Sequence, residues 1–129
     1  MRLALCIYKV LFLCPFLSIN RLNNLYKAVI GIVLVTIHKN GITLAGHAGY
    51  APRGQDIVCA AVSALTYTLQ ESLNRLTEDT VGFSYAPGRV DISFADLSAQ
   101  GQMIINSFIV GMELLAGSYP DNVNLSRRE

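Results

Sequence analysis

The chain has 129 residues, a length that corresponds to one domain and allows a hydrophobic core without disulfide or metal support. Residues 1–28 carry four basic side chains and no acidic one, whereas residues 29–129 carry six basic and nine acidic side chains, a local charge of −3. The mildly acidic body argues against a surface for nucleic-acid phosphates, and we expect no nucleic-acid partner.

The cysteines give an odd count of three, and two of them, Cys6 and Cys14, lie within residues 1–28. The sequence contains no CxxC pair and no Cys/His cluster, so it predicts no metal site and no cofactor. The body has a single thiol, Cys59, which is typical of a protein kept in a reducing cytosol.

Residues 1–28 form an N-terminal extension, and several interpretations of it remain open. A secretory signal would explain the basic start, but no small-residue cleavage site follows. A membrane-spanning helix needs about 20 apolar residues, whereas the longest uncharged run, residues 10–20, is shorter and contains Pro15. The extension can also lie upstream of the true start, be disordered or form an ordered addition to a domain at residues 29–129.

The first part of the body predicts a β-hairpin followed by a helix. Apolar residues alternate over residues 33–38, and a second strand is expected over residues 42–47, with Asn40-Gly41 as a two-residue turn because both residues tolerate a positive φ. A loop with two glycines and Pro52 follows over residues 48–55. Asp56 is a suitable N-cap for a helix over residues 57–76, in which leucines recur at helical spacing up to Leu76.

The second part of the body repeats this order. Residues 81–85 and 90–94 alternate as two strands joined by a Pro87-Gly88 turn. A helix is expected from about residue 98 to 115, ended by Gly117, and a short edge strand over residues 123–125. The apolar side of this helix is expected to hold Met103, Ile104, Phe108, Met112 and Leu115. The ββα-ββα-β order predicts an α+β fold with a mainly antiparallel sheet packed against two helices.

The candidate catalytic residues are His47 and Cys59. With Asp56 as N-cap, Cys59 lies in the first helical turn, where free N–H groups and the helix dipole favour a thiolate and can hold an oxyanion. The loop can fold His47 back over this helix start, where an imidazole would accept the thiol proton and later protonate the leaving amine. Asp56 would orient His47 or only cap the helix, and Ser63 follows Cys59 by four residues on the same helix face.

Each of these residues also has a purely structural interpretation. Free cysteine is among the most buried residue types, so Cys59 can be a small core residue. His47 can be a structural residue at a strand end, and Ser63 a helix-packing residue. The loop glycines Gly49 and Gly54 can serve turns alone, or can let the loop move to admit a peptide substrate. A Cys/His pair at this spacing is therefore a weak motif when taken alone.

The stretch GHAGYAPRGQDIVCAAVSAL, residues 46–65, resembles the signature of the ribosomal-processing cysteine protease family, Prp. The resemblance covers about residues 33–125 and implies a cytoplasmic, homodimeric cysteine endopeptidase. It implies catalytic roles for His47 and Cys59, with supporting roles for Asp56 and Ser63. Family members begin near the first strand and lack a counterpart of residues 1–28, which favours a misplaced start over a secretory signal.

The same resemblance implies the substrate, a short N-terminal extension on large-subunit ribosomal protein twenty-seven whose removal enables ribosome assembly. Two other hypotheses remain. The chain can be a noncatalytic ribosome-associated dimeric binding module with Cys59 in its core, or a small membrane protein dominated by residues 1–28. The reactivity of the Cys59 thiol distinguishes the protease from the binding module, because a core thiol resists a mild alkylating agent.

Overall fold

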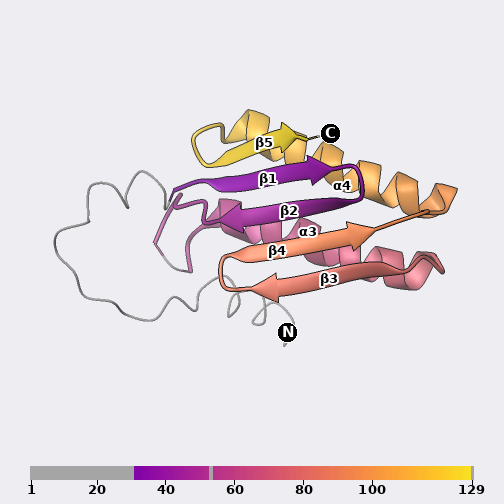
Figure 1. Ribbon diagram of the computed structural model, residues 1–129. Coiled ribbons are helices and arrows are strands. Elements are labelled where there is room, and N and C mark those ends of the chain that lie inside the picture. Colours follow the sequence, from indigo (N-terminus) through magenta and orange to yellow (C-terminus); the bar gives the residue numbers. More distant parts are fainter. Residues whose placement is uncertain (1–30, 53, 129) are drawn as a thin grey trace.

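The computed structural model describes residues 31–52 and 54–128, so the interpretations of residues 1–28 lie outside the described residues. The elements follow the predicted ββα-ββα-β order, and the predicted α+β class is confirmed (Figure 1). The elements are β1 (Val33–His38), β2 (Gly41–Gly46), α3 (Ile57–Leu76), β3 (Val81–Ala86), β4 (Arg89–Phe94), α4 (Ala99–Ser118) and β5 (Val123–Arg127).

The five strands form one sheet in the order β3-β4-β2-β1-β5. Strand β5 runs parallel to β1, and the other three neighbouring pairs are antiparallel, so the sheet is mainly antiparallel as predicted. Both helices lie on the same side of the sheet (Figure 1). Because β2 is the central strand and α3 is the next element, the connecting loop starts in the middle of the sheet and ends in the helix layer.

The core lies between the sheet and the two helices. Side chains of a strand alternate between the two faces of a sheet, and in β1 Val33 and Val35 are buried whereas Leu34 is 51% exposed. Both helices turn an apolar stripe toward this face. The buried hydrophobic side chains come from the strands (Val33, Val35, Ile42, Leu44, Val90, Ile92, Val123), from the helices (Val58, Cys59, Val62, Leu69, Leu73, Ile105, Phe108, Met112) and from the loop after β2 (Ala48).

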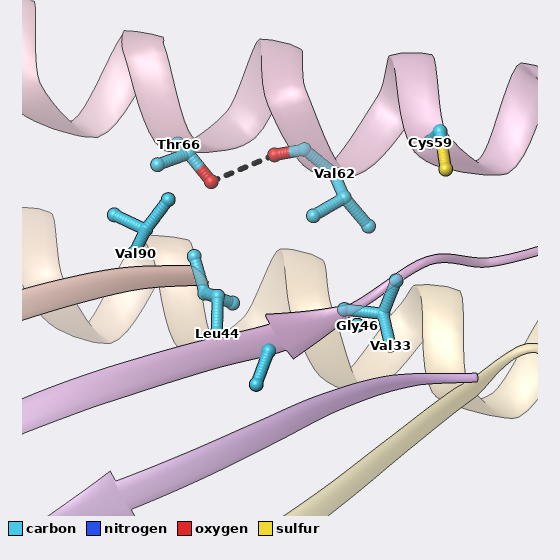
Figure 2. A pocket seen from close by; sticks show the side chains of 8 residues that line it. Val33, Leu44, Gly46, Cys59, Val62, Thr66 and Val90 are labelled. Carbon is cyan, nitrogen blue, oxygen red and sulfur yellow. Dashed lines mark hydrogen bonds between the residues drawn. The ribbon is translucent and has the colours of Figure 1, made fainter. Parts of the chain in front are cut away.

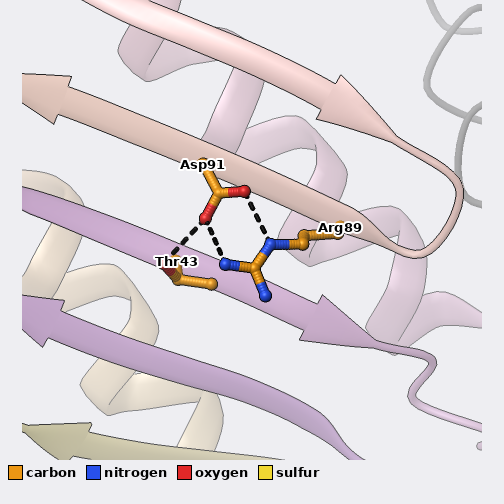
Figure 3. Close-up of polar contacts among 3 residues, drawn as sticks. All are labelled: Thr43, Arg89 and Asp91. Carbon is orange, nitrogen blue, oxygen red and sulfur yellow. Dashed lines mark hydrogen bonds and ion pairs between the residues drawn. The ribbon is translucent and has the colours of Figure 1, made fainter.

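The opposite face of the sheet carries a polar cluster made of Thr43, Arg89 and Asp91 (Figure 3). Thr43 and Asp91 are direct partners in the β2–β4 register, and the Thr43 hydroxyl donates to Asp91 Oδ1 over 2.9 Å. Arg89 donates to both carboxylate oxygens, at 2.6 and 2.8 Å. The hydrogen bond from Arg89, assisted by Thr43, lowers the pKa of Asp91 below its ordinary value. This face therefore pairs its charges at the surface instead of burying apolar side chains.

The turn between β1 and β2 differs from the prediction. His38 pairs with Gly41, so the two turn residues are Lys39 and Asn40 and not Asn40-Gly41. Among the described residues other than glycine, Asp96 alone has a positive φ, so this turn does not use the left-handed region. Gly41 belongs to β2, where a Cβ would lie 2.5 Å from the carbonyl oxygen of Ile92 on β4. The glycine is required by close strand packing and not by the turn.

The helices differ from the predictions at their ends and in some of their buried residues. Helix α4 continues to Ser118, so Gly117 lies in its last turn and does not end it. Met103 is 72% exposed and Leu76 is 68% exposed, although both were expected on apolar sides. The buried stripe of α4 is Gly101, Ile105, Phe108 and Met112, a spacing of four, three and four residues that leaves Met103 on another side. In the described part of the chain, neither helix is long and apolar enough to cross a membrane.

Candidate active site

Asp56 connects the start of α3 to the loop that precedes it. Its Oδ1 accepts a hydrogen bond from the Cys59 amide over 2.8 Å, which is the predicted N-cap. Its Oδ2 accepts a hydrogen bond from the Tyr50 amide over 3.1 Å. The Cys59 amide, one of the first-turn N–H groups that the sequence suggested could hold an oxyanion, is therefore engaged by the cap. One carboxylate that is 8% exposed fixes both the helix start and the loop.

The loop brings His47 and Cys59 together, as the sequence predicted. Strand β2 ends at Gly46, so His47 is the first residue beyond the strand. Its Nδ1 lies 3.8 Å from Cys59 Sγ, close enough for proton exchange after a small adjustment. The next amide along the chain, that of Ala48, donates to Sγ over 3.4 Å. The thiol therefore faces an imidazole and a backbone donor that both come from the loop.

The acidity of Cys59 is opposite to the expectation from the sequence. The pKa of the thiol is raised from 9.0 to about 11, chiefly because burial disfavours the charged thiolate. The amides of Ala48 and Gly49 act in the opposite direction, since hydrogen bonds to sulfur stabilise the anion, while the charge and hydrogen bonding of Asp56 raise the pKa further. Burial and the carboxylate that caps the helix thus outweigh the amide hydrogen bonds to the sulfur. In this conformation the residue is a neutral thiol.

A small apolar pocket lies between α3 and the sheet, and Cys59 is at one end of it (Figure 2). Its volume is about 20 Å³, which is close to the space that one water molecule needs. The Thr66 hydroxyl donates to the Val62 carbonyl over 2.8 Å, so its polar atom is already paired. The pocket is lined by Val33, Leu44, Ala45, Gly46, Cys59, Val62, Thr66 and Val90. A pocket of this size does not admit a substrate side chain.

The remaining predicted site residues lie around this centre. Ser63 is half-buried on α3, one turn beyond Cys59, whereas Val62 and Thr66 line the pocket with the thiol. Gly49 and Gly54 both lie in the left-handed region, with φ of 59° and 87°, where an L side chain is strained. The two glycines therefore set the path of the loop, which agrees with their turn interpretation.

Sequence reasoning missed the contribution of the segment after α4. Asn122 donates from Nδ2 to the carbonyl oxygen of Ala48 over 2.7 Å, across 74 residues of sequence. The ring of Tyr119 meets that of Tyr50 edge-to-face, with centroids 5.4 Å apart. No local pattern signals these contacts, because they arise only when β5 pairs with β1 and brings the preceding turn to the loop.

Comparisons with known proteins agree with this geometry. Residues 30–124 match the family model described as cysteine protease Prp. The ribosomal processing cysteine protease Prp of Bacillus subtilis is 29% identical over 69% of this chain and 88% of its own length. Its namesake from Staphylococcus aureus is 25% identical over 71% of this chain and 93% of its own length.

Solved structures share the fold. The structure of Prp from S. aureus with a covalently linked product peptide superposes with a TM-score of 0.69 at 24% identity and covers 75% of this chain and 98% of that one. A crystal structure of a Streptococcus mutans protein gives a TM-score of 0.60 at 28% identity, covering 74% of this chain and 90% of that one. The chain belongs to the cysteine protease Prp family.

Proposed function

We propose that this cysteine protease removes the short N-terminal extension of large-subunit ribosomal protein twenty-seven and thereby enables ribosome assembly. The 3.8 Å approach of His47 Nδ1 to Cys59 Sγ is the observation that carries this proposal. The relatives named ribosomal processing cysteine proteases support a ribosomal protein as the substrate. The peptide in the S. aureus structures supports a peptide segment as the bound form.

In the proposed reaction, Cys59 Sγ attacks the scissile carbonyl while His47 Nδ1 accepts the thiol proton. A carbon–sulfur bond forms, and the resulting imidazolium then protonates the leaving amine as the carbon–nitrogen bond breaks. Water, activated by His47, hydrolyses the thioester and restores the thiol. Because burial raises the pKa of Cys59 to about 11 in the peptide-free conformation, no thiolate is preformed there.

Access of a peptide to the thiol requires the loop to shift, because Cys59 is only 5% exposed. The two glycines at positive φ, Gly49 and Gly54, are the points at which the loop can change direction at low cost. We propose that the loop opens when the peptide binds. Asp56 then keeps the helix start in place, since its hydrogen bond to the Cys59 amide lies within α3 and its cap.

The substrate proposal is tested with the purified full chain and a peptide that spans the junction between the extension and the mature ribosomal protein. Mass spectrometry of the products should show a single cut at the junction with the parent protein and none with Cys59→Ala. A peptide of the same composition with the junction residues scrambled is the matched control. Equal cleavage of both peptides would reject the assigned substrate while leaving the protease activity in place.

A noncatalytic ribosome-associated binding module is the second candidate, and the burial of Cys59 favours it. Cys59 is 5% exposed and packs with the core residues, which is typical of a structural cysteine. The discriminating measurement is alkylation of the folded chain by iodoacetamide with and without the junction peptide. The peptide should slow the alkylation of a catalytic thiol, because it covers the thiol or acylates it. A core thiol should react with iodoacetamide at the same slow rate in both samples.

We further propose a cytoplasmic homodimer, with a second copy packed on the outer side of α4. Met103, Val110 and Leu114 are 72%, 63% and 70% exposed, and their spacing of seven and four residues aligns them on one side of the helix. Apolar side chains aligned on an exposed side of a helix are typical of an association surface. The family resemblance supports a homodimer, and the placement of the second copy rests on these exposed apolar side chains.

A further inference from the structure

We propose that Asn122 is a positioning residue that holds Ala48 so that the Ala48 amide points at the Cys59 thiol. The proposal rests on the proposed catalytic role of Cys59 but is argued from different contacts. Three features of the structure carry it: the fixed backbone of Asn122, the hydrogen bond from the Ala48 amide to the thiol, and a second contact between the same two segments.

The backbone of Asn122 is held at the end of the sheet. Its carbonyl oxygen accepts a hydrogen bond from the Val33 amide over 2.8 Å, and its amide donates to the Tyr119 carbonyl over 2.9 Å. From this fixed position Nδ2 donates to the Ala48 carbonyl over 2.7 Å. Ala48 is fully buried, so its carbonyl depends on a protein partner instead of bulk solvent.

The Ala48 amide donates to Cys59 Sγ over 3.4 Å, and the carbonyl of the same residue accepts the hydrogen bond from Asn122. Fixing this carbonyl therefore limits how far Ala48 can turn its amide away from the sulfur. The amides of Ala48 and Gly49 both lower the pKa of the thiol. Asn122 therefore aims a donor at the thiolate that forms during catalysis.

A second contact holds the same two segments together. Tyr119 packs its ring edge-to-face on Tyr50, three residues after His47. The Tyr50 amide donates to Asp56, which ties the loop to the start of α3. The Tyr50 ring and the Ala48 carbonyl contact Tyr119 and Asn122, which tie the loop to the segment before β5. The loop that carries the donors is thus held by two separate parts of the fold.

The test is the pH dependence of Cys59 alkylation by iodoacetamide in the full chain, for the parent and for Asn122→Ala. Asn124→Ala, an exposed asparagine two residues further on β5, is the matched control. We expect the Asn122→Ala thiol to titrate at higher pH and its alkylation at pH 8 to slow on the order of tenfold, because a donor to the sulfur is misaligned. Peptide cleavage should lose kcat by a similar factor with KM unchanged.

A role limited to folding would lower the melting temperature of Asn122→Ala and leave the alkylation profile of the folded protein unchanged, and that result would overturn the proposal. If Asn122→Ala does not fold, the parent still decides the question by nuclear magnetic resonance. A scalar coupling between Asn122 Nδ2 and the Ala48 carbonyl carbon is expected, and its absence contradicts the proposal. Alkylation needs no peptide. If the alkylation profile of Asn122→Ala is shifted while the parent does not cleave the peptide, the proposed function is rejected and the positioning role is retained.

Discussion

The carboxylate of Asp56 and the thiol of Cys59 share the first turn of α3, joined by the 2.8 Å hydrogen bond from the Cys59 amide to Asp56 Oδ1. The cap that makes the helix start stable also places a negative charge beside the nucleophile. This charge and the hydrogen bonding of Asp56 add to the effect of burial and raise the pKa of the thiol. Stability of the helix start and acidity of the thiol are therefore in opposition at this site.

Replacing Asp56 by asparagine tests this opposition. The Asp56→Asn side chain still offers an oxygen to the Cys59 amide but carries no charge, so the pKa of Cys59 should fall below about 11. Alkylation of the folded variant at pH 8 should be several-fold faster, while the free energy of unfolding drops by about 1 kcal/mol because the bond to Tyr50 is lost. Asp121→Asn, an exposed control, should change neither quantity. A pKa that rises in Asp56→Asn contradicts the assigned cause.

The raised pKa of Cys59 also predicts how stability depends on pH. The thiol of the unfolded chain ionises near 9.0, whereas that of the folded chain ionises near 11, so the folded state binds more protons between these values. The stabilisation of the folded state by the protonated Cys59 thiol is complete below pH 9 and is lost as the pH rises toward 11. Relative to Cys59→Ala, the parent should lose on the order of 2 kcal/mol across this window, as measured by urea unfolding. Parallel pH curves for the two proteins would mean that the folded thiol has an ordinary pKa.

The two methionines Met112 and Met103 form a matched pair on α4. Met112 is fully buried against the sheet, so Met112→Ala should lower the free energy of unfolding by about 2–5 kcal/mol through lost contacts and a cavity. Met103 is 72% exposed, and Met103→Ala should change the free energy of unfolding by less than about 0.5 kcal/mol. Denaturant unfolding of both variants gives the comparison. Equal losses would place Met103 in the core, as the sequence pattern suggested.

The proposed dimer predicts a defect that is specific to one side of α4. Val110→Glu introduces a charge into the exposed apolar stripe and should convert a dimer into a 14.1 kDa monomer in light scattering after size exclusion. Gln102→Glu, an equally charged change on another exposed side of the helix, should leave the dimer intact. A dimer that survives Val110→Glu would assign the contact to another surface.

The element order, the fold class and the cap were predictable because their causes are local. Asp56 precedes a long run with helical spacing, and alternating apolar residues mark each strand, so sequence windows of a few residues contain the information. The turn at Lys39-Asn40 was missed because Gly41 is required by the close approach of the Ile92 carbonyl on β4, and no local sequence window contains that contact.

The approach of His47 to Cys59 was predictable from the sequence, whereas the acidity of the thiol was not. The proximity of His47 and Cys59 follows from a strand end, a loop and a helix start, all within residues 46–59. The pKa of Cys59 depends on burial by the sheet, and the support of Ala48 by Asn122 spans 74 residues, so neither has a local signal. Both required the packed fold.

The most direct test of the central claim compares the two histidines and the thiol in one cleavage assay on the junction peptide. His47→Ala and Cys59→Ala should each abolish cleavage while remaining folded, because one removes the base and the other the nucleophile. His38→Ala, which alters the exposed histidine at the end of β1, should cleave at the parental rate. Cleavage that persists in folded His47→Ala or Cys59→Ala would contradict the assigned dyad.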